Sequence, residues 1–205
     1  MSKKKRTLFI LEKFESQFKQ KGFDVICGVD EAGRGSLAGP VVAAAVVLNQ
    51  DVNIEDIKDS KLLSAKKREQ LFCEISENSI DFCISEASSE EIDKLNILNA
   101  TLLAMQRAVN GLNTKPDIAL IDGNVAPKLN LKSKTIVHGD SICISIAAAS
   151  ILAKVYRDSL MFKCHTKYPI YNFSKHKGYG TKFHFEAIKK YGLCPIHRKS
   201  FKLFK

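Results

Sequence analysis

The sequence predicts a single α/β domain built on a mixed sheet. Short apolar runs rich in Val, Ile and Ala alternate with longer segments of helical periodicity, which is the pattern of strands interleaved with helices. A Gly-rich turn joins the first two runs directly, so they can form an antiparallel hairpin beside parallel strands. The 205 residues are 45% apolar and 26% charged, values typical of one globular domain.

The first part of the domain is expected to contain two helices and two strands. Residues 7–21 have apolar side chains at helical spacing, and Gly22 ends the helix. We expect the segments "DVICGVD" and "VVAAAVVL" to be buried strands. The second is short for a helix and rich in Val, which favours a strand. The next helix is expected from Ser64 to about Asn78.

The rest of the domain continues this alternation. A long helix is expected from Ser89 to Val109. The third, fourth and fifth strands are expected at "DFCISEAS", "DIALIDG" and "SKTIVHGD". A helix at about Ile142–Phe162 is apolar on most sides and therefore buried, and a last helix is expected at about Thr181–Tyr191.

Charge is distributed unevenly along the chain. Residues 1–22 carry seven Lys or Arg against two Glu, and residues 163–205 carry eleven against one, whereas the whole chain has a net charge of +10. The middle of the chain is therefore acidic. Basic flanks around an acidic centre fit a protein that grips a phosphate backbone and holds cations at its chemical site. A merely soluble basic surface is the alternative.

The cysteines and the apolar runs indicate where the protein works. The cysteines lie in apolar or helical stretches without any C-x-x-C pair, which favours reduced thiols and the cytosol. No signal-peptide pattern is present, and the longest apolar run, Val41–Leu48, has the length of a strand rather than of a membrane span. We expect a cytoplasmic protein without a membrane segment and, because heptads are lacking, a monomer.

Four acidic residues lie at or near the ends of predicted strands. Asp30 and Glu31 adjoin the turn "GRG", which we expect to end the first strand there, Asp122 closes the fourth strand, and Asp140 closes the fifth. In open α/β sheets the carboxyl ends of the strands form the site, so these acids can converge. Repulsion among buried carboxylates is tolerated mainly when cations lie between them, and oxygen ligands select Mg²⁺ or Mn²⁺.

Two other interpretations of these residues are simpler. Taken singly, each acid is more often a helix cap or a surface charge, so only the set is persuasive. The glycines of "GRGSLAG" could indicate a phosphate-binding loop, but their spacing is one residue too long for G-x-G-x-x-G and no G-K-[ST] follows. We therefore favour a cation site.

At this point the sequence resembles the bacterial ribonuclease HII family. The resemblance rests on five blocks that span residues 24–201 in the family's order: "GVDEAGRGSLAGPVVAAAVVL", "LIDGN", "GDSICISIAAASILAKVYRD", "HKGYGT" and "PIHRKSF". Ribonuclease HIII differs by an extra N-terminal domain and by lysine at the position of Arg34. One departure is Leu62 in "DSKLLS", where the family commonly has a second lysine.

The resemblance implies a fold and a chemistry. It implies an RNase H-like fold, with a five-stranded mixed sheet flanked by helices and a helical C-terminal segment. It also implies an endonuclease that uses two divalent cations, Mg²⁺ or Mn²⁺, held by the catalytic carboxylates Asp30, Glu31, Asp122 and Asp140. The implied substrates are RNA/DNA hybrids and duplex DNA with an embedded ribonucleotide, cut to leave 3′-hydroxyl and 5′-phosphate ends.

The single domain then divides into an N-terminal basic helix (1–22), a catalytic α/β core (23–162) and a basic C-terminal substrate-binding segment (163–205). Gly33, Arg34 and Gly35 are expected to contact the ribose, because the two glycines lack side chains and let the backbone approach it closely. Tyr179 resembles the family's tyrosine that senses the 2′-hydroxyl, although a lone tyrosine among glycines is otherwise a loop-packing residue. The remaining expected contacts to the substrate backbone are Lys61, His176 and Lys177.

Several other residues have either a structural or a functional interpretation. Arg157 could pair with Asp158 or contact substrate, and His138 and His197 are expected to be structural. The tail "SFKLF" faintly resembles peptides that dock on sliding clamps, with packing of Phe201 against the domain as the simpler alternative. The rival functions are a strand-transfer nuclease of the same fold and a basic protein that only coats nucleic acid.

Overall fold

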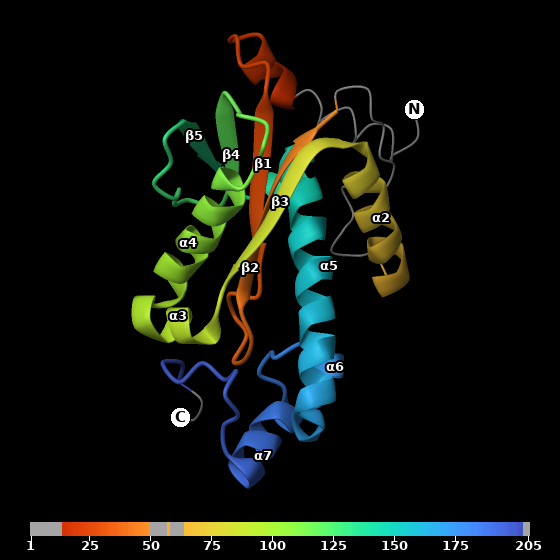
Figure 1. Ribbon diagram of the computed structural model, residues 1–205, viewed down its shortest axis with the longest axis vertical. Helices are drawn as coiled ribbons and strands as arrows, with labels where there is room; N and C mark the ends of the chain where they lie inside the picture. Colours follow the sequence, from red (N-terminus) through yellow and green to blue (C-terminus); the bar gives the residue numbers. More distant parts are fainter. Residues whose placement is uncertain (1–13, 50–56, 58–63, 203–205) are drawn as a thin grey trace.

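The computed structural model describes residues 14–49, 57 and 64–202. Within these residues a five-stranded sheet lies between two layers of helices (Figure 1). Its strands are β1 (Ile26–Ala32), β2 (Val41–Leu48), β3 (Ser79–Ala87), β4 (Ile118–Asp122) and β5 (Lys132–Ile136). The predicted α/β class and the mixed five-stranded sheet are confirmed.

The order of the strands brings three carboxyl ends to one edge of the sheet. The order is β3-β2-β1-β4-β5. The pairs β1/β2 and β2/β3 are antiparallel, as the direct turn predicts, whereas β1/β4 and β4/β5 are parallel. Because β1, β4 and β5 run in the same direction, the residues that follow them lie at a common edge.

Helices cover both faces of the sheet. On one face α2 (Ala65–Asn78) and α5 (Ile144–Lys167) pack on Val42, Ala44 and Val46 of β2, and on the other α3 (Ser89–Leu95) and α4 (Ile97–Asn110) cover the alternate residues of that strand. This two-sided burial explains why "VVAAAVVL" is apolar throughout rather than alternating. Helix α5 crosses β1 so closely that a Cβ at Gly28 would lie 2.1 Å from the carbonyl carbon of Ser145.

Two predicted elements differ in the structure. The single helix expected from Ser89 to Val109 is two helices, because Asn96 takes a left-handed φ of 68° and its side chain caps α4 by accepting the N–H of Asn99 at 3.1 Å. Strand β5 ends before His138, whose φ is 57°, and a 3₁₀ turn, η2 (Gly139–Ser141), follows it. Asp140 therefore lies on this turn and not at the end of the strand.

The two ends of the described chain pack against opposite ends of the sheet. Residues 14–19 are helical and bury Phe18 against β1, β4 and β5, whereas residues 1–13 of the expected helix lie outside the described residues. At the other end η3 (Pro169–Tyr171), α6 (Phe173–His176) and α7 (Lys182–Tyr191) pack beside the loop that follows β1 (Figure 1). No helix among the described residues combines the length and apolarity that crossing a bilayer requires.

Candidate active site

The carboxylates of β1 lie inside the strand ladder. Asp30 pairs with Ala44 and Glu31 with Ala43, and β1 continues to Ala32, two residues beyond the expected strand "DVICGVD". Adjacent residues of a strand point to opposite faces, so the two side chains leave β1 differently. Asp30 is buried, accepts the N–H of Glu31 at 2.7 Å and is hydrogen-bonded to Ser150 of α5. Glu31 instead pairs with Arg34, its Oε1 lying 3.2 Å from Nη1.

Electrostatics link this pair to Asp122 at the end of β4. Burial raises the pKa of Asp30 well above its ordinary value, and the carboxylates of Glu31 and Asp122 add to the rise. Burial also raises the pKa of Glu31, against the opposing effect of Arg34, and Asp122 again adds to it. These three acids therefore lie close enough to repel one another.

Asp140 reaches the same edge through the turn after β5. The N–H of Gly139 donates to Oδ1 of Asp122 at 2.7 Å, and a Cβ at Gly139 would lie 3.3 Å from that oxygen, so the turn fits closely against Asp122. Asp140 follows directly, is buried, and accepts a hydrogen bond from Ser141 at 3.3 Å. Within the described part of the chain, no three Asp, Glu, His or Cys side chains already form a closed metal-binding group.

The chemistry of this donor set fits a divalent cation. Carboxylate oxygens are the ligands that Mg²⁺ and Mn²⁺ prefer, and the raised pKa values of Asp30 and Glu31 reflect burial and repulsion that a cation would offset. The carboxylates lie at one edge of the sheet without being drawn into a tight cluster.

The loop after β1 is held by two buried arginines. Arg157 of α5 donates to the carbonyls of Ala38, Pro40 and Lys177 at 2.9 to 3.1 Å. Arg198, from the C-terminal segment, donates to those of Gly33, Arg34 and Gly39 at 2.7 to 2.9 Å. Both side chains are 0% exposed, and burial lowers the pKa of Arg198 to about 9.

Residue type and spacing did not indicate that these two arginines bind the carbonyls of the loop. Arg157 bonds to backbone carbonyls, whereas Asp158, its expected partner, pairs with Lys154 at 2.6 Å. Arg198 was not singled out at all, although it lies within the block "PIHRKSF". An arginine whose partners are carbonyls more than 150 residues away leaves no periodic or spacing signal.

The two glycines that flank Arg34 have different surroundings. Gly33 has a φ of 94°, and a Cβ there would lie 1.9 Å from Nε of Arg157, so packing demands glycine at this position. A Cβ at Gly35 would meet no atom within 4 Å, and its φ is not left-handed. Packing therefore requires Gly33 but leaves Gly35 facing open space.

A hollow of about 400 Å³ opens beside Glu31 and this loop. It is lined by Glu31, Ala32, Gly33, Arg34, Gly35, Arg68, Ser150, Ile151, Lys154 and Tyr179. Tyr179 is 39% exposed, and its ring centroid lies 5.7 Å from Cζ of Arg157 and 5.9 Å from Nζ of Lys154. The structure thus brings Tyr179 to the "GRG" loop, and it adds Arg68 and Ser150, which the sequence analysis missed.

The expected backbone contacts have mixed outcomes. His176 was expected to contact substrate, but its Nε2 lies 2.7 Å from the Tyr171 carbonyl and its Nδ1 accepts the N–H of Gly178 at 3.2 Å, so both ring nitrogens are used within the protein. Lys177 donates to the carbonyl of Ser174 and is partly exposed. Lys61 and its neighbour Leu62 lie outside the described residues.

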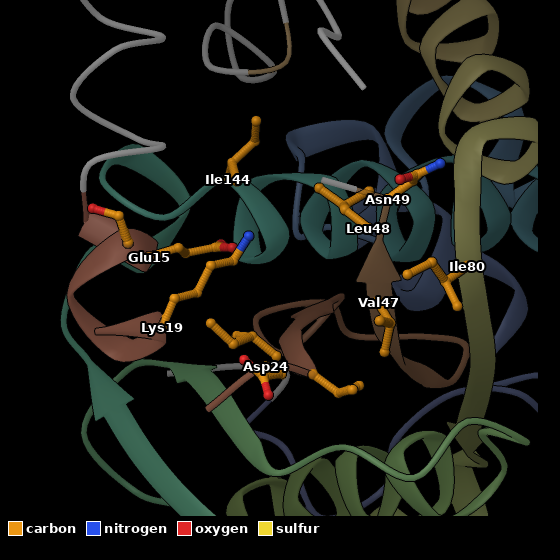
Figure 2. A pocket seen from close by; sticks show the side chains of 11 residues that line it. Glu15, Lys19, Asp24, Val47, Leu48, Asn49, Ile80 and Ile144 are labelled. Carbon is orange, nitrogen blue, oxygen red and sulfur yellow. The ribbon is translucent and has the colours of Figure 1, made fainter. Parts of the chain in front are cut away.

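A second hollow, of about 430 Å³, lies at the opposite end of β1 (Figure 2). Glu15 and Lys19 of the N-terminal helix line it together with Asp24 and the apolar side chains of Val47, Leu48, Ile80 and Ile144. Oε1 of Glu15 accepts hydrogen bonds from N–H and Oγ of Ser145, both at 2.7 Å, and from the thiol of Cys143 at 3.0 Å. Glu15 therefore holds the first turn of α5, and this hollow lies away from the carboxylates of the site.

Comparison with known proteins decides the family. Residues 27–204 match the family model of ribonuclease HII. The chain belongs to the ribonuclease HII family. It is 53% identical over 199 residues to ribonuclease HII of Clostridioides difficile (strain 630), a match that covers 97% of this chain and 78% of that protein. Members of this family are metal-dependent endonucleases of the RNase H type that act on RNA/DNA, and this chain is such an enzyme.

Solved structures agree with this family and with its fold. The crystal structure of ribonuclease H2 from Pyrococcus horikoshii OT3 superposes with a TM-score of 0.73 at 30% identity, covering 87% of this chain and 94% of that one. The complex of PCNA with RNase HII from Archaeoglobus fulgidus gives a TM-score of 0.67 at 26% identity, covering 88% of this chain and 96% of that one. The expected RNase H-like fold with a helical C-terminal part is therefore confirmed.

Proposed function

We propose that this ribonuclease HII family member hydrolyses the RNA strand of RNA/DNA hybrids and nicks duplex DNA at embedded ribonucleotides, leaving 3′-hydroxyl and 5′-phosphate ends. The observation that carries the proposal is that Glu31, which interacts electrostatically with Asp30 and Asp122, lines a hollow together with the "GRG" loop and Tyr179. The catalytic group in this proposal consists of Asp30, Glu31, Asp122 and Asp140.

The carboxylates would hold the cofactor. In this proposal Asp30, Glu31, Asp122 and Asp140 ligate two Mg²⁺ or Mn²⁺ ions, with Ser150 orienting Asp30 and the N–H of Gly139 orienting Asp122. Two such cations, when bound, activate a water and stabilise the leaving 3′ oxygen in phosphodiester hydrolysis. The buried acids position their oxygens before substrate arrives, because their hydrogen bonds and packing restrict the side chains.

The "GRG" loop offers backbone donors to the ribose and phosphate. Arg198 fixes the carbonyls of Gly33 and Arg34, and a trans peptide points its N–H opposite to its carbonyl. The N–H groups of Arg34 and Gly35 therefore point away from the buried guanidinium. Because Gly35 carries no side chain and faces open space, a ribose can approach these donors, and its 2′-hydroxyl distinguishes RNA from DNA.

The remaining substrate contacts surround this loop. In this proposal Tyr179 packs against the sugar that carries the 2′-hydroxyl. The positively charged side chains of Arg34, Lys154 and Lys177 attract the phosphate backbone. Lys61 stays a proposed phosphate contact, although it lies outside the described residues. The described part of the basic C-terminal segment, residues 163–202, lies at the same end of the molecule as this loop (Figure 1), which supports duplex binding.

A nicking assay tests the proposal. The protein is incubated with Mg²⁺ or Mn²⁺ and duplex DNA that contains one ribonucleotide, and the position and ends of any nick are determined. We expect a nick at the ribonucleotide, loss of most cleavage with retained duplex binding in Asp122→Asn, and normal cleavage in Glu77→Gln, which alters an exposed residue of α2. An uncut duplex would indicate a coat protein, joined strands a strand-transfer nuclease, and near-normal cleavage by Asp122→Asn would refute the assignment of the carboxylates.

We also propose a cellular location, an oligomeric state and a protein partner for the enzyme. The six cysteines are free thiols, which supports a cytoplasmic location, and we propose that the chain acts as a monomer, which light scattering would test. The archaeal relative solved with PCNA supports sliding-clamp binding through the C-terminal tail. Phe201 packs into the domain and residues 203–205 lie outside the described ones, so a clamp pull-down should compare the full chain with one that lacks only residues 203–205.

A further inference from the structure

Three histidines meet beneath the loop that carries Tyr179. His176 ends α6, His184 lies on α7, and His197 follows from the C-terminal segment. The rings of His176 and His184 stack with centroids 4.5 Å apart, and Nε2 of His184 lies 3.1 Å from Nε2 of His197. His184 and His197 are almost fully buried.

The partners of these rings fix where each proton lies. Nδ1 of His184 lies 2.9 Å from the carbonyl of Tyr179, which can only accept, so Nδ1 carries the proton. Nδ1 of His197 faces the N–H of Cys194 at 2.9 Å and must accept, so His197 carries its proton on Nε2 and donates it to the bare Nε2 of His184. The hydrogen bonds thus run in one direction, from Cys194 through both rings to the Tyr179 carbonyl.

His176 supports the same loop from its other side. Its Nε2–H donates to the carbonyl of Tyr171 at 2.7 Å, and its Nδ1 accepts the N–H of Gly178 at 3.2 Å. Each of the three histidines therefore uses one nitrogen as donor and one as acceptor. A second proton on any of them would place an N–H against another N–H and break one of these bonds.

The loop needs this support because its backbone is unusual. Lys177 has a φ of 52° and Gly178 a φ of 84°, both left-handed, and a non-glycine residue adopts that region at a cost. Arg157 holds the carbonyl of Lys177 at 3.0 Å, and the N–H of Leu37 holds that of Gly178 at 2.8 Å. His184 holds the next carbonyl, so it fixes the peptide from which the Tyr179 ring projects into the hollow.

We propose that His184, supported by His197 and His176, is a positioning residue for Tyr179, which it holds at the angle needed to recognise the ribose. This inference rests on the substrate role proposed above for Tyr179. The three neutral histidines set the specificity of the enzyme for the 2′-hydroxyl without touching substrate. A second proton on His184 would break its Nε2 bond to His197, whereas the Nδ1–H bond to the Tyr179 carbonyl would remain.

The surroundings of the histidines keep them neutral near pH 7. Burial lowers the pKa of His184 to about 4 and also lowers those of His176 and His197. Lys177 and His165 of α5 further oppose a charge on His176. The other titratable or charged groups in and around this cluster are Arg157, Cys164, Tyr171, Cys194, Arg198 and the exposed pair Lys182 and Glu186 of α7.

A double-mutant cycle tests the coupling between His184 and Tyr179. Cleavage at a single embedded ribonucleotide is measured for Tyr179→Ala, His184→Ala and the double variant, with melting temperatures to confirm folding. Because small misplacements of a recognition group cost up to about 100-fold, we expect each single variant to lose roughly 10- to 100-fold. The double variant should be no worse than Tyr179→Ala. His184→Asn, whose amide N–H takes the place of Nδ1–H, should recover most activity, and the control Glu77→Gln, at an exposed position of α2, should cleave normally.

The outcomes separate this inference from the proposed function. Losses that multiply in the double variant would refute the positioning role of His184 while leaving Tyr179 as a substrate contact. Normal cleavage by Tyr179→Ala would instead refute its substrate role, and this inference with it. Nitrogen NMR of the unmodified protein tests the hydrogen-bond direction without any variant: we expect the Nδ1–H form for His184 and the Nε2–H form for His176 and His197. An Nε2–H form of His184 at pH 7 would overturn the inference.

Discussion

The two glycines of the "GRG" loop provide a matched pair for separating folding from substrate recognition. In Gly33→Ala the new Cβ would lie 1.9 Å from Nε of Arg157, far inside any real contact, so the guanidinium has to move. Its bonds to three backbone carbonyls are then weakened or lost. The left-handed φ of 94° adds the strain of a side chain in that region.

The expected destabilisation can be worked out from these contacts. Alanine at a left-handed φ costs about 1–2 kcal/mol, and losing one or two hydrogen bonds from a charged donor costs about 1.5–3 kcal/mol each. The sum is about 2.5–8 kcal/mol, which for a protein of this size lowers the melting temperature by roughly 5–30 °C. Gly35→Ala meets no atom within 4 Å, so its melting temperature should change by no more than about 2 °C.

Calorimetry and the nicking assay together decide the outcome. Gly35→Ala should melt normally and yet lose ribonucleotide cleavage, because its methyl group occupies the space that the ribose needs. Gly33→Ala should lose both properties. Equal melting temperatures for the two variants would refute the account of Arg157 as a brace, and full activity in Gly35→Ala would refute close approach of the ribose at that position.

Three further predictions follow from individual contacts. Asn96→Ala should lower the free energy of unfolding by about 1–2 kcal/mol in urea titrations, because it removes the cap of α4 at a left-handed φ, and Asn96→Gly should cost less; equal losses would contradict this explanation. The pKa of His184 falls to about 4 in the fold from an ordinary value of 6.5, so its neutral form contributes stability that is full above pH 6.5 and is lost as the pH falls toward 4. His184→Asn should remove about 3 kcal/mol of this acid-induced loss of stability, which calorimetry at several pH values would measure. Arg68→Ala should weaken duplex binding and reduce its salt dependence; an unaltered salt slope would place Arg68 outside the substrate path.

Local pattern predicted most of the scaffold. The strand "VVAAAVVL" is recognisable because burial on both faces requires apolar residues throughout, and the helix Ala65–Asn78 because Ser64 accepts the N–H of Lys67 at its start. The break at Asn96 was missed because apolar spacing continues across it and only a backbone angle marks it. Asp140 was placed on a strand because the 3₁₀ turn before α5 depends on the left-handed His138.

The candidate site was predictable in its carboxylates and less so in its support. Asp30, Glu31 and Asp122 follow from the rule that strand ends form sites, and the structure brings them into electrostatic contact. The bracing of the loop by Arg157 and Arg198, and the use of His176 within the protein, depend on partners far away in the sequence. Residue type and spacing do not reveal such partners, because these contacts form only when distant parts of the chain fold together.

The bond between Arg198 and Gly33 spans 165 residues, so a segment that is synthesised later completes a loop that is synthesised earlier. Closing so long a span is entropically unfavourable and slow compared with forming a local turn. A nascent chain on the ribosome therefore has its acidic cluster before it has a finished recognition loop. Cleavage competence should therefore arise only after the segment that carries Arg198 has docked on the loop.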